Sequence, residues 1–331
     1  MENKNLSEED FSLVILSKVD PERPLPTDIY LKVDGKFIKF KSKADPIGTE
    51  KYELFIAKGV KNIYVPADEV MTFLEWLNEA SEEEEGTFVD EFGEENRGFF
   101  KRSKDFKEKV YDVYFEDELN EELVEKLQDN VSDFVDEIKK NPITSQAIAL
   151  MLSKNSSVAD HSVNVANLAV YIGMALGHGH QFVLENIYMG AIFHDYGKLK
   201  IDPRILENQD NRMYSHAVQD HPMSGVRMMR KTEGIPTQVL TIILQHHEQF
   251  NGHGFPKGLA GDEIYELAQI VSMANIFDNT LSENKQLPSH ERYKRALKII
   301  EFDNGKNWNP KYIDRVLDAL SLAFHIRKKS A

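Results

Sequence analysis

The chain has 331 residues, with 18 glycines, 12 prolines and no cysteine. Its 41% hydrophobic and 29% charged residues are typical of a globular protein, which excludes extensive disorder and collagen-like repeats. The absence of cysteine excludes disulfides, thiolate metal sites and a cysteine nucleophile. A formal net charge of −15 argues against DNA or a membrane surface as a partner.

The length favours two domains, and no apolar run approaches the roughly 18 residues that a membrane-spanning helix needs. The N-terminal string MENKNLSEEDF is acidic and polar, unlike a signal peptide. We therefore expect a cytoplasmic protein with an α+β two-domain fold, in which a small N-terminal α/β domain precedes an all-helical domain.

Residues 1–85 are predicted to form the small α/β domain, with a regulatory or interaction role. Two β-rich runs flank Asp34-Gly35, and Asp-Gly between such runs predicts a tight hairpin because the turn needs positive φ. A further strand is expected at 62–65, and residues 69–78 carry the apolar spacing of a helix.

Residues 86–142 are predicted to form an acidic linker and connecting helices. The segment 81–97 contains four consecutive glutamates at 82–85, and such a block predicts a solvated linker or loop because like charges repel. The alternative is a docking segment for a basic protein partner. Apolar spacing then predicts helices at 104–115 and 119–140, and Asn141-Pro142 predicts a break before the next domain.

Residues 143–331 are predicted to form a domain of about seven helices. Five histidines and one aspartate recur on the apolar faces or at the ends of these helices, and His221 is expected to open one of them, just before Pro222. This set comprises His161, His194, Asp195, His221, His246 and His247, with Asp278 on the face of the last apolar stripe. One buried histidine commonly has its own partner, but a shared metal cluster would satisfy all of them at once.

The donor types restrict the metal. Imidazole and carboxylate without thiolate suit iron, manganese, zinc, nickel or cobalt. The number of donors exceeds a tetrahedral zinc site, so two metals are more economical. Asp195 has two oxygens and adjoins His194, which makes it the natural bridging ligand.

Several strings resemble the HD-GYP family, a branch of the HD-domain metal-dependent phosphohydrolases. They are ADHSVNVANLA, FHDYGKLKI, DHPMSG, LQHHEQFNGHGFPKGLAGDEI and AQIVSMANIFDNTL, and the resemblance extends over roughly residues 143–325. The ordered set, with the double histidine preceding NGHGFPKGL, is specific to that family.

The resemblance implies a helical domain with two divalent metal ions, iron or alternatively manganese, and cyclic di-GMP as the substrate class. The metal-ligand roles transfer to His161, His194, Asp195, His221, His246 and His247, and Lys198 matches a lysine that meets a substrate phosphate. Asp195 and Lys198 are thus the predicted catalytic residues. A metal-bridging hydroxide would open the phosphodiester to give pGpG or GMP.

The chain departs from the family pattern at several positions. Gly254-Phe255-Pro256 replaces Gly-Tyr-Pro, so the ring remains and its hydroxyl is lost, while Gly254 and Phe255 are still expected at the substrate. Asn275 aligns with the family's last carboxylate ligand, and Asp278, one turn later, either replaces it or meets the lysine and substrate. Ser157 stands where some members carry a glutamate for a third metal, which favours two metals here.

A further departure is that ENKQLP at 283–288 replaces an Arg-Pro-Tyr stretch that helps to hold the substrate in the family. Two functions therefore stay open. One is an active cyclic di-GMP phosphodiesterase. The other is a degenerate member that binds cyclic di-GMP or a protein partner with little or no turnover; hydrolysis of a related nucleotide is a third reading.

Overall fold

The computed structural model describes residues 7–115, 119–140, 158–206 and 210–325. The chain divides into two compact units, Met1–Lys101 and Arg102–Ala331. The division falls within the segment 86–142 that was expected to connect the domains. The predicted break at 141–142, the expected boundary there and Ser157 lie outside the described residues.

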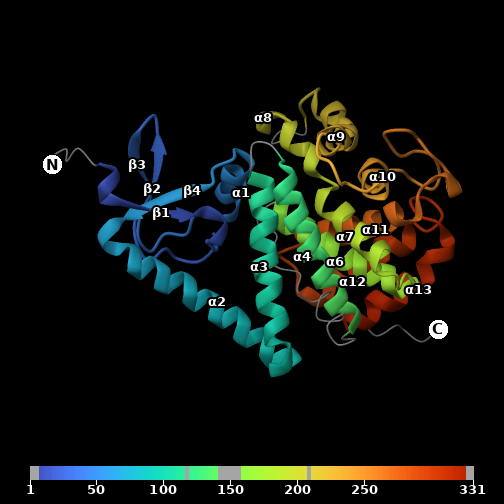
Figure 1. The fold of residues 1–331 in the computed structure, drawn as a ribbon, viewed down its shortest axis with the longest axis horizontal. Helices are drawn as coiled ribbons and strands as arrows, with labels where there is room; N and C mark the ends of the chain where they lie inside the picture. The colour runs from blue at the N-terminus through green and yellow to red at the C-terminus, as the bar shows by residue number, and fades with distance from the viewer. Residues whose placement is uncertain (1–6, 116–118, 141–157, 207–209, 326–331) are drawn as a thin grey trace. The chain divides into compact units, whose positions relative to one another are not determined.

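The first unit contains a four-stranded antiparallel sheet with strand order β1-β4-β2-β3 (Figure 1). The predicted hairpin is present, and its turn residues Asp34 and Gly35 have φ of 50° and 75°. The strands are β1 (Phe11–Ile15), β2 (Ile29–Val33), β3 (Lys36–Lys41) and β4 (Asn62–Pro66). The small N-terminal sheet domain of the predicted fold is thus confirmed, and β1 was not foreseen.

Two helices accompany this sheet: α1 (Thr49–Ala57), which was not predicted, and α2 (Val70–Phe92). The core of the unit gathers apolar residues from the strands, from α1 and from the first turns of α2. Its most buried members are Leu16, Ile29, Ile47, Tyr52, Ile63, Val65 and Phe73. The short 3₁₀ helices of the unit are η1 (Glu8–Asp10), η2 (Leu16–Lys18), η3 (Ala67–Glu69) and η4 (Glu94–Asn96).

The prediction of a loop at 81–97 was wrong, because α2 continues through the glutamate run to Phe92 and η4 follows. Glutamate is a good helix former, and its charge is compensated here. Arg97 pairs with Glu85 and Glu94, and Lys101 lies 3.4 Å from Glu85. Neighbouring cations thus remove part of the repulsion that the loop prediction relied on.

Helix α3 (Arg97–Phe115) crosses the division between the units, and α4 (Glu121–Lys140) follows it. Both agree with the predicted helices. Their buried apolar residues belong to the second unit from residue 102 onward, and α4 packs against α7. The stacked rings of Phe106 and Phe134, with centroids 5.7 Å apart, join α3 to α4, and Tyr188 of α7 contacts both rings edge-on.

The rest of the second unit is helical, as predicted, with eight α-helices in the described part beyond residue 157. They are α6 (Val158–Ala175), α7 (Gln181–Phe193), α8 (Pro203–Leu206), α9 (Tyr214–Met229), α10 (Thr237–Gln245), α11 (Glu266–Glu283), α12 (Ser289–Phe302) and α13 (Pro310–Ala323). The 3₁₀ helices are η5 (Tyr196–Lys200) and η6 (Gly261–Glu263). Helices α6, α7 and α11 form the centre of the unit, since each packs on the other two.

Two glycines allow the close approach of these helices. A Cβ at Gly190 of α7 would lie 2.7 Å from the Ile242 side chain of α10. A Cβ at Gly197 of η5 would lie 2.0 Å from the carbonyl oxygen of His221 on α9. No described helix is long and apolar enough to span a membrane.

Candidate metal centre

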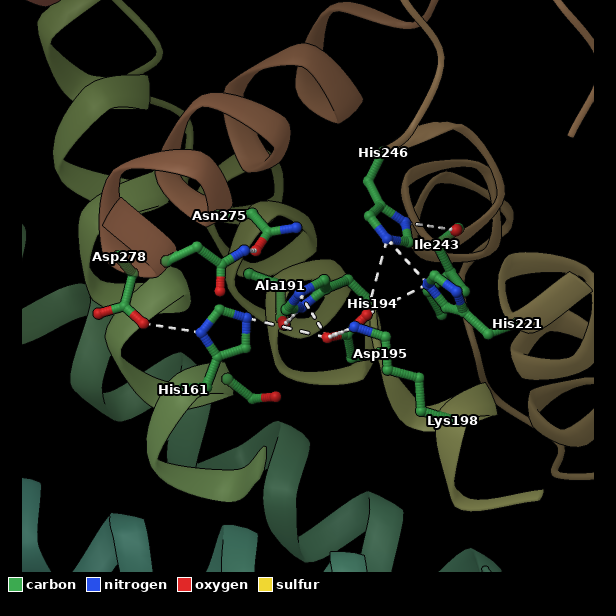
Figure 2. Close-up of polar contacts among 12 residues, drawn as sticks. His161, Ala191, His194, Asp195, Lys198, His221, Ile243, His246, Asn275 and Asp278 are labelled. Atoms are coloured by element: carbon green, nitrogen blue, oxygen red, sulfur yellow. Dashed lines mark hydrogen bonds and ion pairs between the residues drawn. The ribbon is translucent and has the colours of Figure 1, made fainter. Parts of the chain in front are cut away.

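Six of the eight predicted ligands converge from four elements of the second unit (Figure 2). Their ligand atoms form two clusters, in each of which all atoms lie within 4.8 Å of one another. Subsite A comprises His161, His194 and Asp195, and subsite B comprises Asp195, His221, His246 and His247. Asp195 belongs to both clusters.

The two oxygens of Asp195 face different clusters. Oδ2 lies 3.5 Å from Nε2 of His194 and 3.8 Å from Nε2 of His161. Oδ1 lies 3.1 Å from Nε2 of His221 and 3.9 Å from Nε2 of His246. A carboxylate between two sets of imidazoles has the arrangement of a bridging ligand.

Three of the imidazoles are held by the same local contact. In each, Nδ1–H donates to the backbone carbonyl three residues earlier in the chain, so that Nε2 points into the cluster. The pairs are His194 with Ala191 at 2.7 Å, His221 with Val218 at 2.5 Å, and His246 with Ile243 at 2.8 Å. Such second bonds fix the tautomer and ring orientation of metal-binding histidines.

The contact at His221 corrects one prediction. His221 does not open a helix but lies in the middle of α9, which begins at Tyr214 and contains Pro222. Proline has no N–H, so the carbonyl of Val218, four residues before Pro222, has no helical donor from that position. The His221 imidazole donates to this carbonyl instead.

His161 is held differently, by a side chain from another helix. Its Nδ1 lies 2.7 Å from Oδ2 of Asp278 on α11, and Asn164 donates to the other oxygen of Asp278 at 3.2 Å. Asp278 is not a member of either cluster of ligand atoms. The Asp278 carboxylate therefore contacts the candidate ligand His161 and is not itself among the clustered ligand atoms.

Asn275 lies one turn before Asp278 on α11 and is 3% exposed. Its side-chain oxygen accepts a hydrogen bond from Asn279 at 2.7 Å. The structure thus brings Asn275 to the buried side of α11, and its role as the last ligand stays a prediction.

Lys198 stands at the edge of the centre. Its ammonium lies 2.6 Å from Oδ2 of Asp195, and its side chain is 29% exposed whereas that of Asp195 is 4% exposed. Lys198 therefore places a partly exposed cation beside the buried carboxylate of Asp195. A substrate contact by Lys198 stays a prediction.

The environment of these groups favours the protonation states that metal binding needs. Burial lowers the pKa of His194 to about 4, and it holds the pKa values of His246 and His247 well below the ordinary value. Burial alone would raise the pKa of Asp195, but the Lys198 ammonium opposes it and the pKa lies well below the usual range. At neutral pH the imidazoles of His194, His246 and His247 are therefore neutral, and the Asp195 carboxylate is ionised.

Two ring nitrogens lack the hydrogen bonds that buried polar atoms normally make. Among the described residues, Nε2 of His194 and Nε2 of His247 are buried without a hydrogen-bond partner. Leaving such atoms unsatisfied is costly unless something else binds them. One unsatisfied nitrogen lies in each subsite, and together with the ionised carboxylate that both subsites share they form a donor set that fits divalent metal ions.

The loop that carries Gly254-Phe255-Pro256 packs directly on subsite B. The Phe255 ring stacks on the His247 ring, with centroids 4.5 Å apart and 21° between the planes. The Phe255 N–H donates to the His247 carbonyl at 3.2 Å. A Cβ at Gly254 would lie 2.3 Å from the Gln249 nitrogen and 2.5 Å from the Glu248 Cα, so only glycine fits there.

Glu248 is a site residue that the sequence did not point out. It is 2% exposed, and its carboxylate accepts the backbone N–H groups of Lys257 at 2.7 Å and Leu259 at 2.9 Å. It therefore anchors the returning half of the loop next to His247. A single glutamate after two histidines carries no sequence signal for this role.

Sequence and structure comparisons relate the chain to known proteins. The HD domain family matches residues 142–311. The cyclic di-GMP phosphodiesterase PA4108 of Pseudomonas aeruginosa is 28% identical over 205 residues, which is 60% of this chain and 47% of that protein. The cyclic di-GMP phosphodiesterase response regulator RpfG of Xanthomonas campestris is 32% identical over 141 residues, 40% of this chain and 35% of that protein.

Among solved structures, Bd1817, an HDG"Y"P protein from Bdellovibrio bacteriovorus, has a TM-score of 0.61 at 23% identity and covers 94% of this chain and 100% of its own. That likeness shows the fold of both units. The chain spans less than half the length of the two curated relatives described above. The family match covers just over half of the sequence and contains every ligand of the two subsites, and the chain therefore belongs to the HD domain family, in its HD-GYP branch.

Proposed function

We propose that the chain is a metal-dependent phosphodiesterase that hydrolyses cyclic di-GMP to pGpG or GMP. The observation that carries the proposal is the position of Asp195, whose two oxygens face subsite A and subsite B respectively. Both curated relatives described above are named as cyclic di-GMP phosphodiesterases, which supports the same substrate class here.

The donor set supports a pair of divalent ions, iron or alternatively manganese, because imidazoles and one shared carboxylate hold the centre without thiolate. Such a pair, when bound, supplies Lewis-acid charge to a phosphoryl group and lowers the pKa of water for attack on phosphorus.

The chain's own residues would orient and charge-balance the reacting phosphate. Lys198 would exchange part of its contact with Asp195 for a phosphoryl oxygen, since its ammonium is partly exposed beside the bridge. Gly254 allows the loop to lie close to the centre, and the stacked ring of Phe255 covers one side of His247. No serine or cysteine nucleophile is required.

A second candidate function is supported by two departures from the family pattern. Phe255 offers no hydroxyl at the centre, and Asn275 is a neutral amide whose oxygen already accepts from Asn279. The missing hydroxyl would weaken substrate binding, and a neutral amide is a weaker metal ligand than a carboxylate. In this reading the chain binds cyclic di-GMP with little turnover and signals through a protein partner of the N-terminal unit.

One assay of metal-replete protein separates these functions. Elemental analysis should approach two metals per chain, and the products of cyclic di-GMP are followed by chromatography beside a binding isotherm. Release of pGpG or GMP by the wild type, and none by Asp195→Ala, supports the phosphodiesterase. Two metals with binding but no product favours the second candidate. A metal content near zero would contradict both.

A further inference from the structure

We infer that Tyr114 of helix α3 is a positioning residue for subsite A. Helix α3 lies outside the residues that match the HD domain family, which begin at 142. The inference rests on the metal centre proposed above and adds to it a part of the chain that the family comparison does not include.

The Tyr114 hydroxyl joins the two helices that carry the subsite A ligands. It donates to the Ile192 carbonyl of α7 at 2.5 Å and lies 2.7 Å from the Ser162 hydroxyl of α6. Because the single hydroxyl proton is directed at Ile192, Ser162 is the donor in the second contact. Ser162 directly follows His161, and Ile192 precedes His194 by two residues.

The ring of Tyr114 contacts Tyr196, which is the residue next to Asp195, the third ligand of subsite A. It meets the Tyr196 ring edge-on, with centroids 5.4 Å apart, and Tyr196 directly follows Asp195. Tyr114 is 5% exposed and Ser162 is fully buried. One buried side chain therefore contacts a residue within two positions of each subsite A ligand.

Helix α3 also contacts Asp160, the residue on the N-terminal side of His161. The buried Asp160, which directly precedes His161, accepts from the Tyr111 hydroxyl at 2.6 Å and pairs with Lys107. Buried polar groups keep their positions when such partners satisfy them. Two contacts from α3 thus fix the first turn of α6, at the residues before and after the ligand.

The variant Tyr114→Phe removes the hydroxyl and keeps the ring against Tyr196. The Ile192 carbonyl and the Ser162 hydroxyl then lose a shared partner, so the spacing of α6 and α7 at the ligands is less restricted. Loss of partners behind metal ligands typically costs 10- to 100-fold in metal affinity. Since Tyr114 acts through neighbouring residues, we expect about tenfold at subsite A, the low end of that range.

The chain offers a closely matched control in Tyr188→Phe. The Tyr188 hydroxyl on α7 donates to Asn167 on α6 at 2.9 Å, and the residue is fully buried. It joins the same two helices through the same chemistry, but neither residue adjoins a ligand. A general loosening of α6 against α7 would affect both variants alike.

The test measures Mn²⁺ binding by calorimetry in two backgrounds. His247→Ala weakens subsite B and leaves subsite A to be measured, and His161→Ala does the reverse. Tyr114→Phe should weaken Mn²⁺ binding about tenfold in the His247→Ala background and leave it within about twofold in the His161→Ala background. Circular dichroism confirms that each variant is folded.

Equal losses in the two backgrounds, or the same loss from Tyr188→Phe, would overturn the inference while the metal centre stands. Wild-type protein that binds no Mn²⁺ would overturn the centre and the inference with it. If Tyr114→Phe does not fold, Ser162→Ala removes only one partner of the hydroxyl and is compared in the same backgrounds, with the same selective loss expected.

Discussion

The carboxylate of Asp278 lies 2.7 Å from Nδ1 of His161, although the two residues are 117 positions apart. A carboxylate that accepts a hydrogen bond from Nδ1 orients the ring so that Nε2 points toward Asp195. It also makes Nε2 more basic and thus a stronger metal ligand. Asn164 holds the other oxygen of Asp278. These contacts support a positioning role for Asp278, in contrast to the direct replacement of a missing ligand that was one of the sequence-based alternatives.

The variant Asp278→Ala should weaken metal binding at subsite A by roughly 10- to 100-fold, because His161 loses the group that orients it. Asn275→Ala is the matched comparison, since Asn275 lies one turn away on α11 and its oxygen bonds only Asn279 among the described contacts. Metal affinity is measured by calorimetry for both. A larger loss in Asn275→Ala would identify the amide as the ligand.

The variant Asp195→Ala should release metal from both subsites, since the bridging group is lost. A ligand at 100 times its Kd stabilises the folded state by about 2.7 kcal/mol, which corresponds to roughly 5–10 °C in Tm for a unit of this size. Melting is compared with and without chelator. Asp202→Ala is the control, because Asp202 pairs with the exposed Arg204. An unchanged metal content in Asp195→Ala would refute the bridge.

The variant Gly197→Ala should destabilise the second unit. Its Cβ would lie 2.0 Å from the His221 carbonyl oxygen and 2.6 Å from the Gly225 nitrogen, and backbone atoms cannot turn aside as a flexible side chain can. Overpacking of this kind typically costs about 1–3 kcal/mol, and occasionally more. Urea unfolding is compared with Gly179→Ala, where a Cβ meets nothing within 4 Å. Equal stability of the two variants would contradict the packing argument.

Most of the candidate ligand histidines could be singled out from sequence because they lie at helical spacing within an apolar stripe, which is a local sequence pattern. The hairpin at Asp34-Gly35 could also be predicted, because its turn depends only on neighbouring residues in the sequence. Strand β1 and helix α1 were missed, since their residues form an element only against the core of the first unit. Helix α2 was cut short because the cations that compensate its glutamates, Arg97 and Lys101, come from later in the chain.

The contacts that support the candidate ligands could not be predicted from the sequence in the same way. Tyr114 and Ser162 are 48 positions apart, and the contact between His161 and Asp278 spans an even longer interval. Neither pair has a spacing that distinguishes it from other buried polar residues. The placement of His221 failed for a different reason, because proline usually marks a helix start, whereas Pro222 is accommodated within α9.

The variant Glu248→Gln should loosen the loop that covers subsite B. The carboxylate accepts two backbone N–H groups, and an amide has one oxygen for the same task. A hydrogen bond to a charged group is worth about 1.5–3 kcal/mol, so amide exchange at Lys257 or Leu259 should accelerate by roughly 10- to 150-fold. Gln249→Ala, one residue later, serves as the control. Unchanged protection at both positions would count against the anchor.

The variant Phe255→Tyr restores the hydroxyl that the family carries at this position. The ring should keep its stacking on His247, so metal content should not change. If cyclic di-GMP is the substrate, the added hydroxyl gains a bond to a charged phosphate or to water at the centre. Such a bond is typically worth about 1.5–3 kcal/mol, or roughly 10- to 150-fold in rate.

The measurement is kcat/KM for cyclic di-GMP beside the metal content of each variant. Phe255→Leu is the matched control, since it removes the stacked ring without adding a polar group, and it should lower activity through the position of His247. Because the wild type also lacks the Arg-Pro-Tyr stretch, replaced by residues 283–288, we expect Phe255→Tyr to raise activity from a low baseline. A wild-type rate that Phe255→Tyr does not improve would show that the loop acts through its backbone and ring alone.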